Sequence, residues 1–246
     1  MFSLLVCFLV FGATSATSAT GVIHRPSYLV PCSKRGNFSE CAMKHAVAAI
    51  PFMLKGDRRL GLPTFTPLKI SKIEVKGTNG FRVLLKDLNV YGLENVKPLN
   101  IKVDFENRRA QVLSTVPKLV VLGDYEVGGN IMIFALNGHG PVNLTFTNGI
   151  YEYGFEWKTE IRDGLEYGQI TNSNFDYNLK SVKYNFDNII NNDKALSEQV
   201  NKILNLNWEI VNEDIKPSIC DTLLFIHNEM FKKIFTQVPF RELFLD

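Results

Sequence analysis

The chain has 246 residues and is nearly neutral, with 27 Lys and Arg against 25 Asp and Glu and a net charge of +2 at pH 7. This balance gives no basis for a nucleic-acid partner or an acidic surface as partner. Beyond the first 19 residues, no stretch approaches the roughly 18 uninterrupted apolar residues of a membrane-spanning helix, so stable membrane insertion is not expected.

The first 19 residues carry no charged side chain, include an apolar run and end in small residues. This pattern predicts a secretory signal peptide at 1–19, cleaved after Ala16 or Ala19, and its alternative is a buried first strand. The rest of the chain has no linker, charge block or short repeat that would mark a boundary. We therefore predict a secreted, extracellular protein with one domain over residues 20–246.

Three cysteines remain after the predicted cleavage. Cys32 and Cys41 flank a short polar loop, and such a pair in an oxidising compartment predicts a disulfide. Cys220 then remains as a buried inert thiol or, in the alternative, as one half of a bridge between chains. Cys41 and His45 have a spacing that could hold zinc on a helix, but further ligands are missing nearby, so no metal site is predicted.

Two triplets satisfy the N-glycosylation pattern, at Asn37 and at Asn143. Asn37 lies in the loop between the paired cysteines, whereas Asn143 lies in a predicted strand. A loop presents its side-chain amide to the modifying enzyme more easily than a paired strand, so Asn37 is the favoured site.

A short helix is predicted after the polar loop. Ser39 can cap its start, Gly56 can end it, and Pro51 is expected to bend or shorten its last turn.

Strand patterns follow this helix, and Asn79-Gly80 predicts a hairpin turn. The predicted strands cover residues 68–75, 81–91, 101–105, 110–117, 119–128, 130–136, 140–146, 150–161 and 169–186. Several are apolar on both faces, as in 131–136, so both faces of the sheet must be covered, one by a helix and the other by more protein or by a lipid.

Apolar residues recur every three or four positions from Asp193 to Phe235, which predicts one very long helix of roughly 60 Å. Pro217 is expected to kink it or to break it into two. A helix of this length needs a partner of matching length, and the remaining sequence supplies mainly strands. The economical arrangement is an antiparallel sheet that curls around the helix.

Three segments resemble the insect takeout / juvenile-hormone-binding protein family, and the likeness extends over essentially the whole mature chain. They comprise Cys32, Cys41, Lys55-Gly56, Gly61-Leu62-Pro63 and 67–73 at the start, 125–132 and 137–140 in the middle, and 206–209, Pro217, Phe235 and 238–244 at the end.

The resemblance implies an α+β fold in which a strongly curved antiparallel β-sheet wraps around one long C-terminal α-helix, with a short N-terminal helix and an internal apolar tunnel. It also implies a monomeric secreted carrier of a small lipophilic molecule, such as a juvenile-hormone-like terpenoid, a fatty acid or another isoprenoid, with no cofactor. The hormone-binding branch has a second disulfide to the long helix. Since Cys220 has no mature partner other than Cys32 or Cys41, the chain looks more like the takeout branch.

A carrier replaces the water around a lipid with apolar wall, at about 0.8 kcal/mol for each buried CH₂ group. For each candidate wall residue taken singly, ordinary core packing is the better interpretation, so the prediction concerns the group. The candidates are Ile50, Phe52, Leu54, Phe81, Val83, Leu85, Ile131, Ile133, Phe134, Phe155, Trp157, Ile203, Leu224 and Phe231.

Two other classes of function remain as alternatives. A lipid esterase is disfavoured because the chain has no Gly-x-Ser-x-Gly motif, Gly138-His139-Gly140 only faintly resembles an oxyanion loop, and Cys220 and His227 lie about 10 Å apart along a helix. We therefore predict that the protein is not an enzyme. The other alternative is a signalling or structural protein that presents its surface and keeps its tunnel filled or closed.

Overall fold

The structure is a computed structural model that describes residues 22–78 and 80–246. The signal peptide predicted at 1–19 and Asn79 of the predicted hairpin turn lie outside the described residues. The helices are α1 (Phe38–Met53), α2 (Lys194–Leu206), α3 (Trp208–Phe235) and α4 (Phe240–Leu243), with a 3-10 helix η1 (Leu93–Asn95). The strands are β1 (Cys32–Ser33), β2 (Leu68–Lys76), β3 (Arg82–Tyr91), β4 (Lys97–Asp104), β5 (Arg109–Ile131), β6 (Phe134–Arg162), β7 (Leu165–Asn178), β8 (Ser181–Phe186) and β9 (Phe244–Leu245).

Two long antiparallel strands, β5 and β6, run the length of the main sheet. Arg109 pairs with Glu156 at one end and Ile131 with Phe134 at the other. The outer edge of β5 is covered by β4 on its first half and by β3 on its second half. The outer edge of β6 is covered in the same way by β8 and then β7, and β2 extends the sheet beyond β3. Each long strand therefore joins two halves of one sheet.

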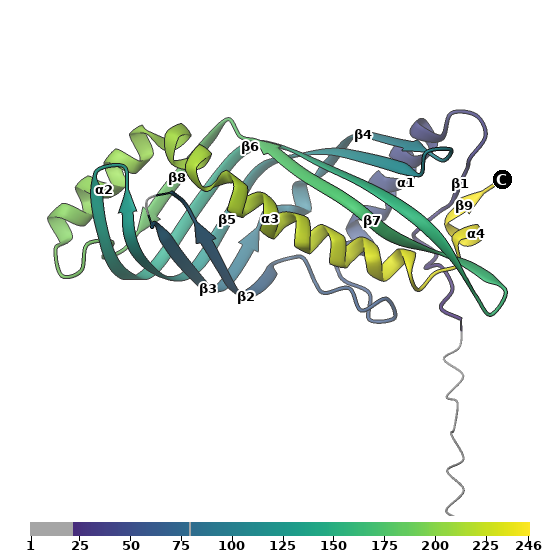
Figure 1. The fold of residues 1–246 in the computed structure, drawn as a ribbon, viewed down its shortest axis with the longest axis horizontal. Coiled ribbons are helices and arrows are strands. Elements are labelled where there is room, and N and C mark those ends of the chain that lie inside the picture. Colours follow the sequence, from purple (N-terminus) through teal and green to yellow (C-terminus); the bar gives the residue numbers. More distant parts are fainter. Residues whose placement is uncertain (1–21, 79) are drawn as a thin grey trace, which may run out of the picture.

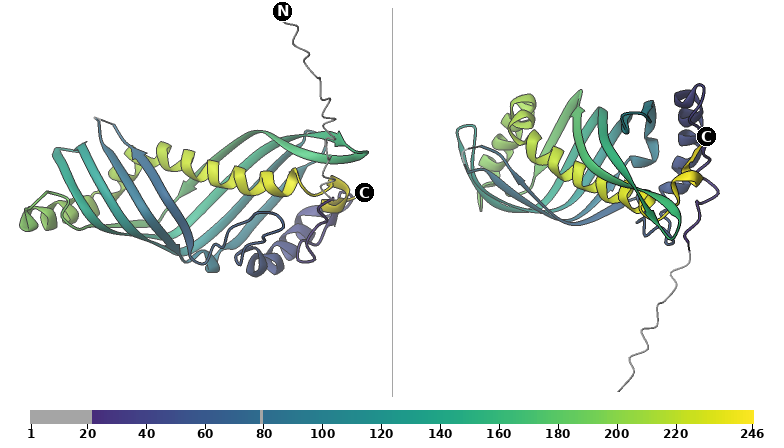
Figure 2. Two further views of the ribbon diagram at one scale, coloured as in Figure 1. Left: turned by 90° about the horizontal axis from the view of Figure 1, so that it is seen from below. Right: turned by 45° about the vertical axis from the view of Figure 1, so that its right-hand side comes forward.

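The sheet curves around α3, which lies in its trough (Figures 1 and 2). The helix packs against β7, β8 and β2. Its Ser218 Oγ accepts a hydrogen bond of 3.1 Å from the backbone N–H of Lys76 at the end of β2. On the other side, Lys216 Nζ lies 2.8 Å from Asp176 Oδ1 of β7. Side chains of α3 thus reach both free edges, which confirms the predicted curved sheet around a C-terminal helix.

One end of the sheet is covered by α2. Asparagines of this helix bind the free edge of β8. Asn205 Oδ1 accepts from Tyr184 N at 2.7 Å, and Asn205 Nδ2 donates to Tyr184 O at 2.8 Å. One helical turn earlier, Asn201 makes the same two bonds to the backbone of Phe186. An exposed edge strand is a template for aggregation, and here helical side chains satisfy its backbone instead.

The long helical region divides at Asn207, so the predicted break into two helices at Pro217 was wrong, while the alternative of a kink there stays a prediction. Asn207 has φ −116° and ψ 31°, outside helical values, and it ends α2 and precedes α3. Pro217 lies inside the continuous α3. The tertiary contacts of the surrounding helix outweigh the single backbone hydrogen bond that proline removes.

Several strand boundaries also differ from the prediction. The runs at 110–117 and 119–128 form one strand, β5, while 169–186 is divided into β7 and β8. The predicted strand at 130–136 was wrong, because Met132 and Ile133 form the two-residue turn between β5 and β6. Met132 adopts φ 53°, the left-handed conformation that such hairpin turns require.

The short helix α1 starts one residue before the predicted cap. Asn37, not Ser39, is the N-cap, and its side chain accepts a hydrogen bond of 3.3 Å from Glu40 N. Pro51 lies within the last turn, and the helix ends at Met53. Gly56 follows with φ +79°, and its N–H donates to Met53 O at 2.9 Å.

Candidate functional site

A cavity of about 600 Å³ lies between α1, the concave face of the sheet and the second half of α3. Its volume falls within the range of roughly 300 to 1,000 Å³ typical of small-molecule sites. Strands β2 to β6 supply most of one wall, with residues such as Ile70, Leu88, Val103 and Val121. The lining is almost entirely apolar.

Helix α1 closes this cavity with one of its faces. The lining residues of α1 recur at helical spacing and are Phe38, Ala42, His45, Ala46, Ala49, Ile50 and Met53. Three of the seven are alanines, which leave room between the helix and the sheet. This face was only partly predicted, because Ile50 and Leu54 were expected in the wall and the alanines were not.

Aromatic rings gather at the end of the cavity near α4. Phe155 lies 5.3 Å from Phe231 and 5.5 Å from Phe235, measured between ring centroids. Trp157 and Phe244 pack against the same Phe235 ring, and all five residues line the cavity. Edge-on and tilted ring pairs of this kind are favourable in protein interiors, so they make a firm wall.

His227 of α3 is a polar group in the cavity wall. Its Nδ1 lies 2.8 Å from the carbonyl oxygen of Leu223, so Nδ1 carries the hydrogen and donates it, which leaves Nε2 as an acceptor. The ring packs between Tyr153 and Phe175, with centroids 5.3 and 4.8 Å away. Burial lowers the pKa of His227, so the imidazole is neutral at pH 7.

The other polar lining groups add little charge. Burial raises the pKa of Tyr151 to about 12, so its hydroxyl is protonated. Arg25 is the only Lys, Arg, Asp or Glu among the described lining residues. Its Nη1 donates to the backbone carbonyls of Pro26 and Leu29. Apart from Arg25, the cavity therefore offers a neutral wall with isolated hydrogen-bonding groups.

Six of the fourteen predicted wall residues line the cavity, namely Ile50, Leu54, Leu85, Phe155, Trp157 and Phe231. The other eight do not. Phe52 and Ile133 point to solvent, with 53% and 89% of their surface exposed, because they lie on the outer face of α1 and in the β5–β6 turn. Phe81, Val83 and Ile131 are buried in the solid core, and Phe134 and Leu224 are partly buried against it. Ile203 is partly buried in α2.

The cavity does not reach the α2 end of the molecule, which is packed with side chains. Tyr125, Val200 and Leu204 are almost fully buried there, at 1%, 0% and 2% exposure. Tyr125 also donates from its hydroxyl to Asp187 O at 2.6 Å. No residue of α2 or β8 contributes to the lining within the described residues. The described interior therefore has a packed half and a hollow half.

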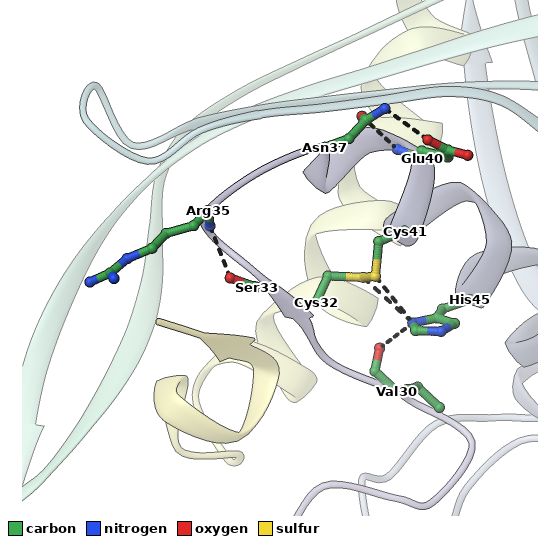
Figure 3. The surroundings of a disulfide bond; sticks show 8 residues. All are labelled: Val30, Cys32, Ser33, Arg35, Asn37, Glu40, Cys41 and His45. Atoms are coloured by element: carbon green, nitrogen blue, oxygen red, sulfur yellow. Dashed lines mark hydrogen bonds between the residues drawn. A yellow bond between two sulfur atoms is a disulfide. The ribbon is translucent and has the colours of Figure 1, made fainter.

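The predicted disulfide is confirmed, with Cys32 and Cys41 joined at an S–S distance of 2.03 Å (Figure 3). It ties the N-terminal arm to α1. His45 lies beside it, with Nδ1 at 3.5 Å from the Cys32 sulfur and 3.2 Å from Val30 O. The two cysteines and His45 lie close enough together to hold a metal ion. Because both sulfurs are in the disulfide, they offer no thiolate ligands.

Two further predictions concern surface chemistry and the third cysteine. Asn37 and Asn143 are both exposed, the first at the start of α1 and the second in the middle of β6. Glycosylation at either position stays a prediction. Cys220 is a half-buried free thiol among the described residues, and burial raises its pKa, which keeps it protonated.

The Gly138-His139-Gly140 segment has a structural explanation. A side chain at Gly138 would collide with the backbone of Asn188 and Ile189, so glycine allows that backbone to pack closely against β6. His139 itself is exposed on the outer face of the strand. The segment is not part of the cavity lining.

A family model described as "Haemolymph juvenile hormone binding protein (JHBP)" matches residues 5–245. The chain belongs to this family. Among solved structures, Takeout 1 of Epiphyas postvittana superposes with a TM-score of 0.77 at 22% identity, covering 88% of this chain and 99% of that one. This likeness shows that the two share a fold, and it agrees with the resemblance found in the sequence.

Two further relatives match parts of this haemolymph juvenile hormone binding protein family member. "Circadian clock-controlled protein daywake" of Drosophila melanogaster is 21% identical over 171 residues, which span 67% of this chain and 65% of the daywake chain. The protein named "Putative beta-carotene-binding protein" of Schistocerca gregaria is 28% identical over 100 residues, or 40% of each chain.

None of the helices within residues 22–78 and 80–246 is long and apolar enough to cross a membrane.

Proposed function

We propose that the protein is a secreted, non-enzymatic carrier that binds a small lipophilic molecule in the cavity between α1, the sheet and α3. The observation that carries this proposal is a cavity of about 600 Å³ whose lining is apolar apart from a few neutral groups and Arg25. Membership of a family named for hormone binding, and a relative named for carotenoid binding, support the same class of ligand.

The energetics fit a ligand with a long hydrocarbon part. Burial contributes about 0.8 kcal/mol for each CH₂ group, so about twelve such groups supply on the order of 10 kcal/mol before the costs of association. A fatty acyl chain, a terpenoid ester or another isoprenoid each carries enough apolar surface. A tunnel that continues to the α2 end is not needed for such a ligand.

Native mass spectrometry of the purified protein tests the proposal. We expect a mass that is releasable on activation and corresponds to a lipid, together with saturable, displaceable binding of a fluorescent fatty acid by the emptied protein. If no lipid mass is found and the emptied protein fails to take up hydrophobic probes, the carrier function is refuted and a role of the surface alone is favoured. Turnover of a generic ester would instead indicate an enzyme.

A further inference from the structure

The outer face of α1 is unusual for a surface helix because it is apolar in its centre. A second stripe at helical spacing runs along the side opposite the cavity, and every one of its residues is exposed: Lys44, Val47, Ala48, Pro51, Phe52 and Lys55. Val47 and Phe52 keep 57% and 53% of their surface exposed. An exposed apolar stripe on a surface helix, rimmed by polar residues, is typical of a docking surface.

Basic residues surround this stripe. Lys44 and Lys55 lie at its two ends, and Lys55 Nζ is 6.0 Å from the centre of the Phe52 ring. Arg58 is exposed just beyond the helix. Residues 22–60 hold seven Lys and Arg against two Asp and Glu, whereas the rest of the chain holds 20 against 23. This segment, called the cap below, therefore has a net charge of +5 in a nearly neutral molecule, although its Lys34 is paired with Asp246 of the C-terminal end.

This cap lies at the end of the molecule opposite α2, outside the sheet (Figures 1 and 2). The inner face of α1 lines the cavity, through residues such as Ala46 and Ala49, and the outer face bears Val47 and Phe52. A single helix therefore separates the cavity from the apolar, basic surface. Any layer that covers the outer stripe lies within one helix diameter of the cavity, about 10 Å.

We propose that the outer stripe of α1 docks on an anionic lipid membrane. Apolar side chains flanked by lysines are the combination that binds the interface of such membranes, because the rings and aliphatic groups enter the acyl boundary while the cations meet the lipid phosphates. A neutral or positive partner surface would not explain the exposed Lys44, Lys55 and Arg58 around the stripe. The docking goes beyond ligand binding, since it assigns a second surface with its own partner.

Sedimentation of the full mature chain with vesicles tests the docking. We expect binding to vesicles of phosphatidylcholine mixed with phosphatidylserine, weakening as salt is raised, and much weaker binding to phosphatidylcholine alone. Reversal of charge in the Lys44→Glu, Lys55→Glu double variant is expected to reduce binding on the order of tenfold or more. The Val47→Ser, Phe52→Ser variant is expected to lose a similar factor.

Matched controls place the same changes elsewhere on the surface. Phe225→Ser alters a phenylalanine of α3 that is 67% exposed, and Lys202→Glu reverses an exposed charge on α2. Both are expected to leave vesicle binding unchanged. Melting temperatures of all variants exclude loss of folding as the cause.

Two results overturn the docking proposal. One is vesicle binding that is absent or insensitive to the α1 variants. The other is a concentration-dependent dimer that Val47→Ser, Phe52→Ser dissolves, which would assign the stripe to a second copy of the chain. Displacement of a fluorescent fatty acid in vesicle-free buffer is measured in parallel, so failure of ligand binding is distinguished from failure of docking.

Discussion

Filling the cavity from α1 gives the most direct test of where a ligand binds. Ala46 lines the cavity, whereas Ala48, on the same helix, is exposed on the outer face. An Ala46→Phe substitution places about six more carbon atoms in the cavity and displaces a similar number of ligand atoms. At about 0.8 kcal/mol for each methylene-sized group, the loss reaches on the order of 5 kcal/mol, or roughly three orders of magnitude in Kd.

The assay is displacement of a fluorescent fatty acid in buffer without vesicles, with Ala48→Phe as the matched control. Ala48→Phe makes the same chemical change on the opposite face and is expected to keep the wild-type Kd. A folded Ala46→Phe variant with wild-type affinity would refute the location of the site. Equal weakening by both variants would show that the effect comes from disturbing the helix and not from filling the cavity.

Three further predictions concern stability. Asn205→Ala removes two hydrogen bonds to the backbone of Tyr184 and is expected to lower the free energy of unfolding by about 1–3 kcal/mol, measured by urea titration. An unchanged urea midpoint would contradict the role of α2 in covering the edge of β8. Because burial lowers the pKa of His227, the unfolded chain binds more protons than the folded one below about pH 6.5, so stability falls as the pH drops from 7 to 5. The His227→Asn variant should show a smaller fall between these pH values, and an identical fall would assign the effect to other groups. Replacing both Cys32 and Cys41 by serine opens a loop with a sequence separation of 9. The free energy of unfolding should fall by about 2–3 kcal/mol, measured as a lower urea midpoint. A fall below about 1 kcal/mol would contradict the loop-closure argument.

The general arrangement could be predicted because it rests on long, regular patterns. The three-to-four spacing after residue 193 fixed a helical face, and the strand patterns before it left a sheet as the only partner of sufficient length. The break at Asn207 could not be predicted in the same way. Its position depends on how α2 lies along the edge of β8 through Asn201 and Asn205, and that contact is tertiary.

The turn at Met132 and Ile133 shows a different limit. Two-residue hairpin turns usually contain Gly, Asn or Asp because these residues adopt positive φ at low cost. This turn has Met132 at φ 53° and a fully apolar sequence, so it looks like the middle of a strand. The long pairing of β5 with β6 on either side stabilises it despite the unfavourable turn residues.

The cavity wall could be predicted only in part because core and cavity use the same residue types. Leu85 lines the cavity, while Val83, two positions earlier on the same face of β3, is buried in the solid half. The two residues differ in the part of the interior that they face, the cavity or the packed half. The local sequence pattern does not distinguish these two surroundings. The alanines of α1 carried the clearest signal, since Ala42, Ala46 and Ala49 recur at helical spacing.

The long β5–β6 hairpin has a consequence for the order in which the chain folds. Its pairing starts at the turn and continues residue by residue to Arg109 and Glu156, so it is available as soon as residue 162 has left the ribosome. The helix that fills the trough comes later, at Trp208–Phe235. During synthesis the concave apolar face is therefore uncovered until α3 has been made, an interval in which chaperones would find exposed apolar surface to bind.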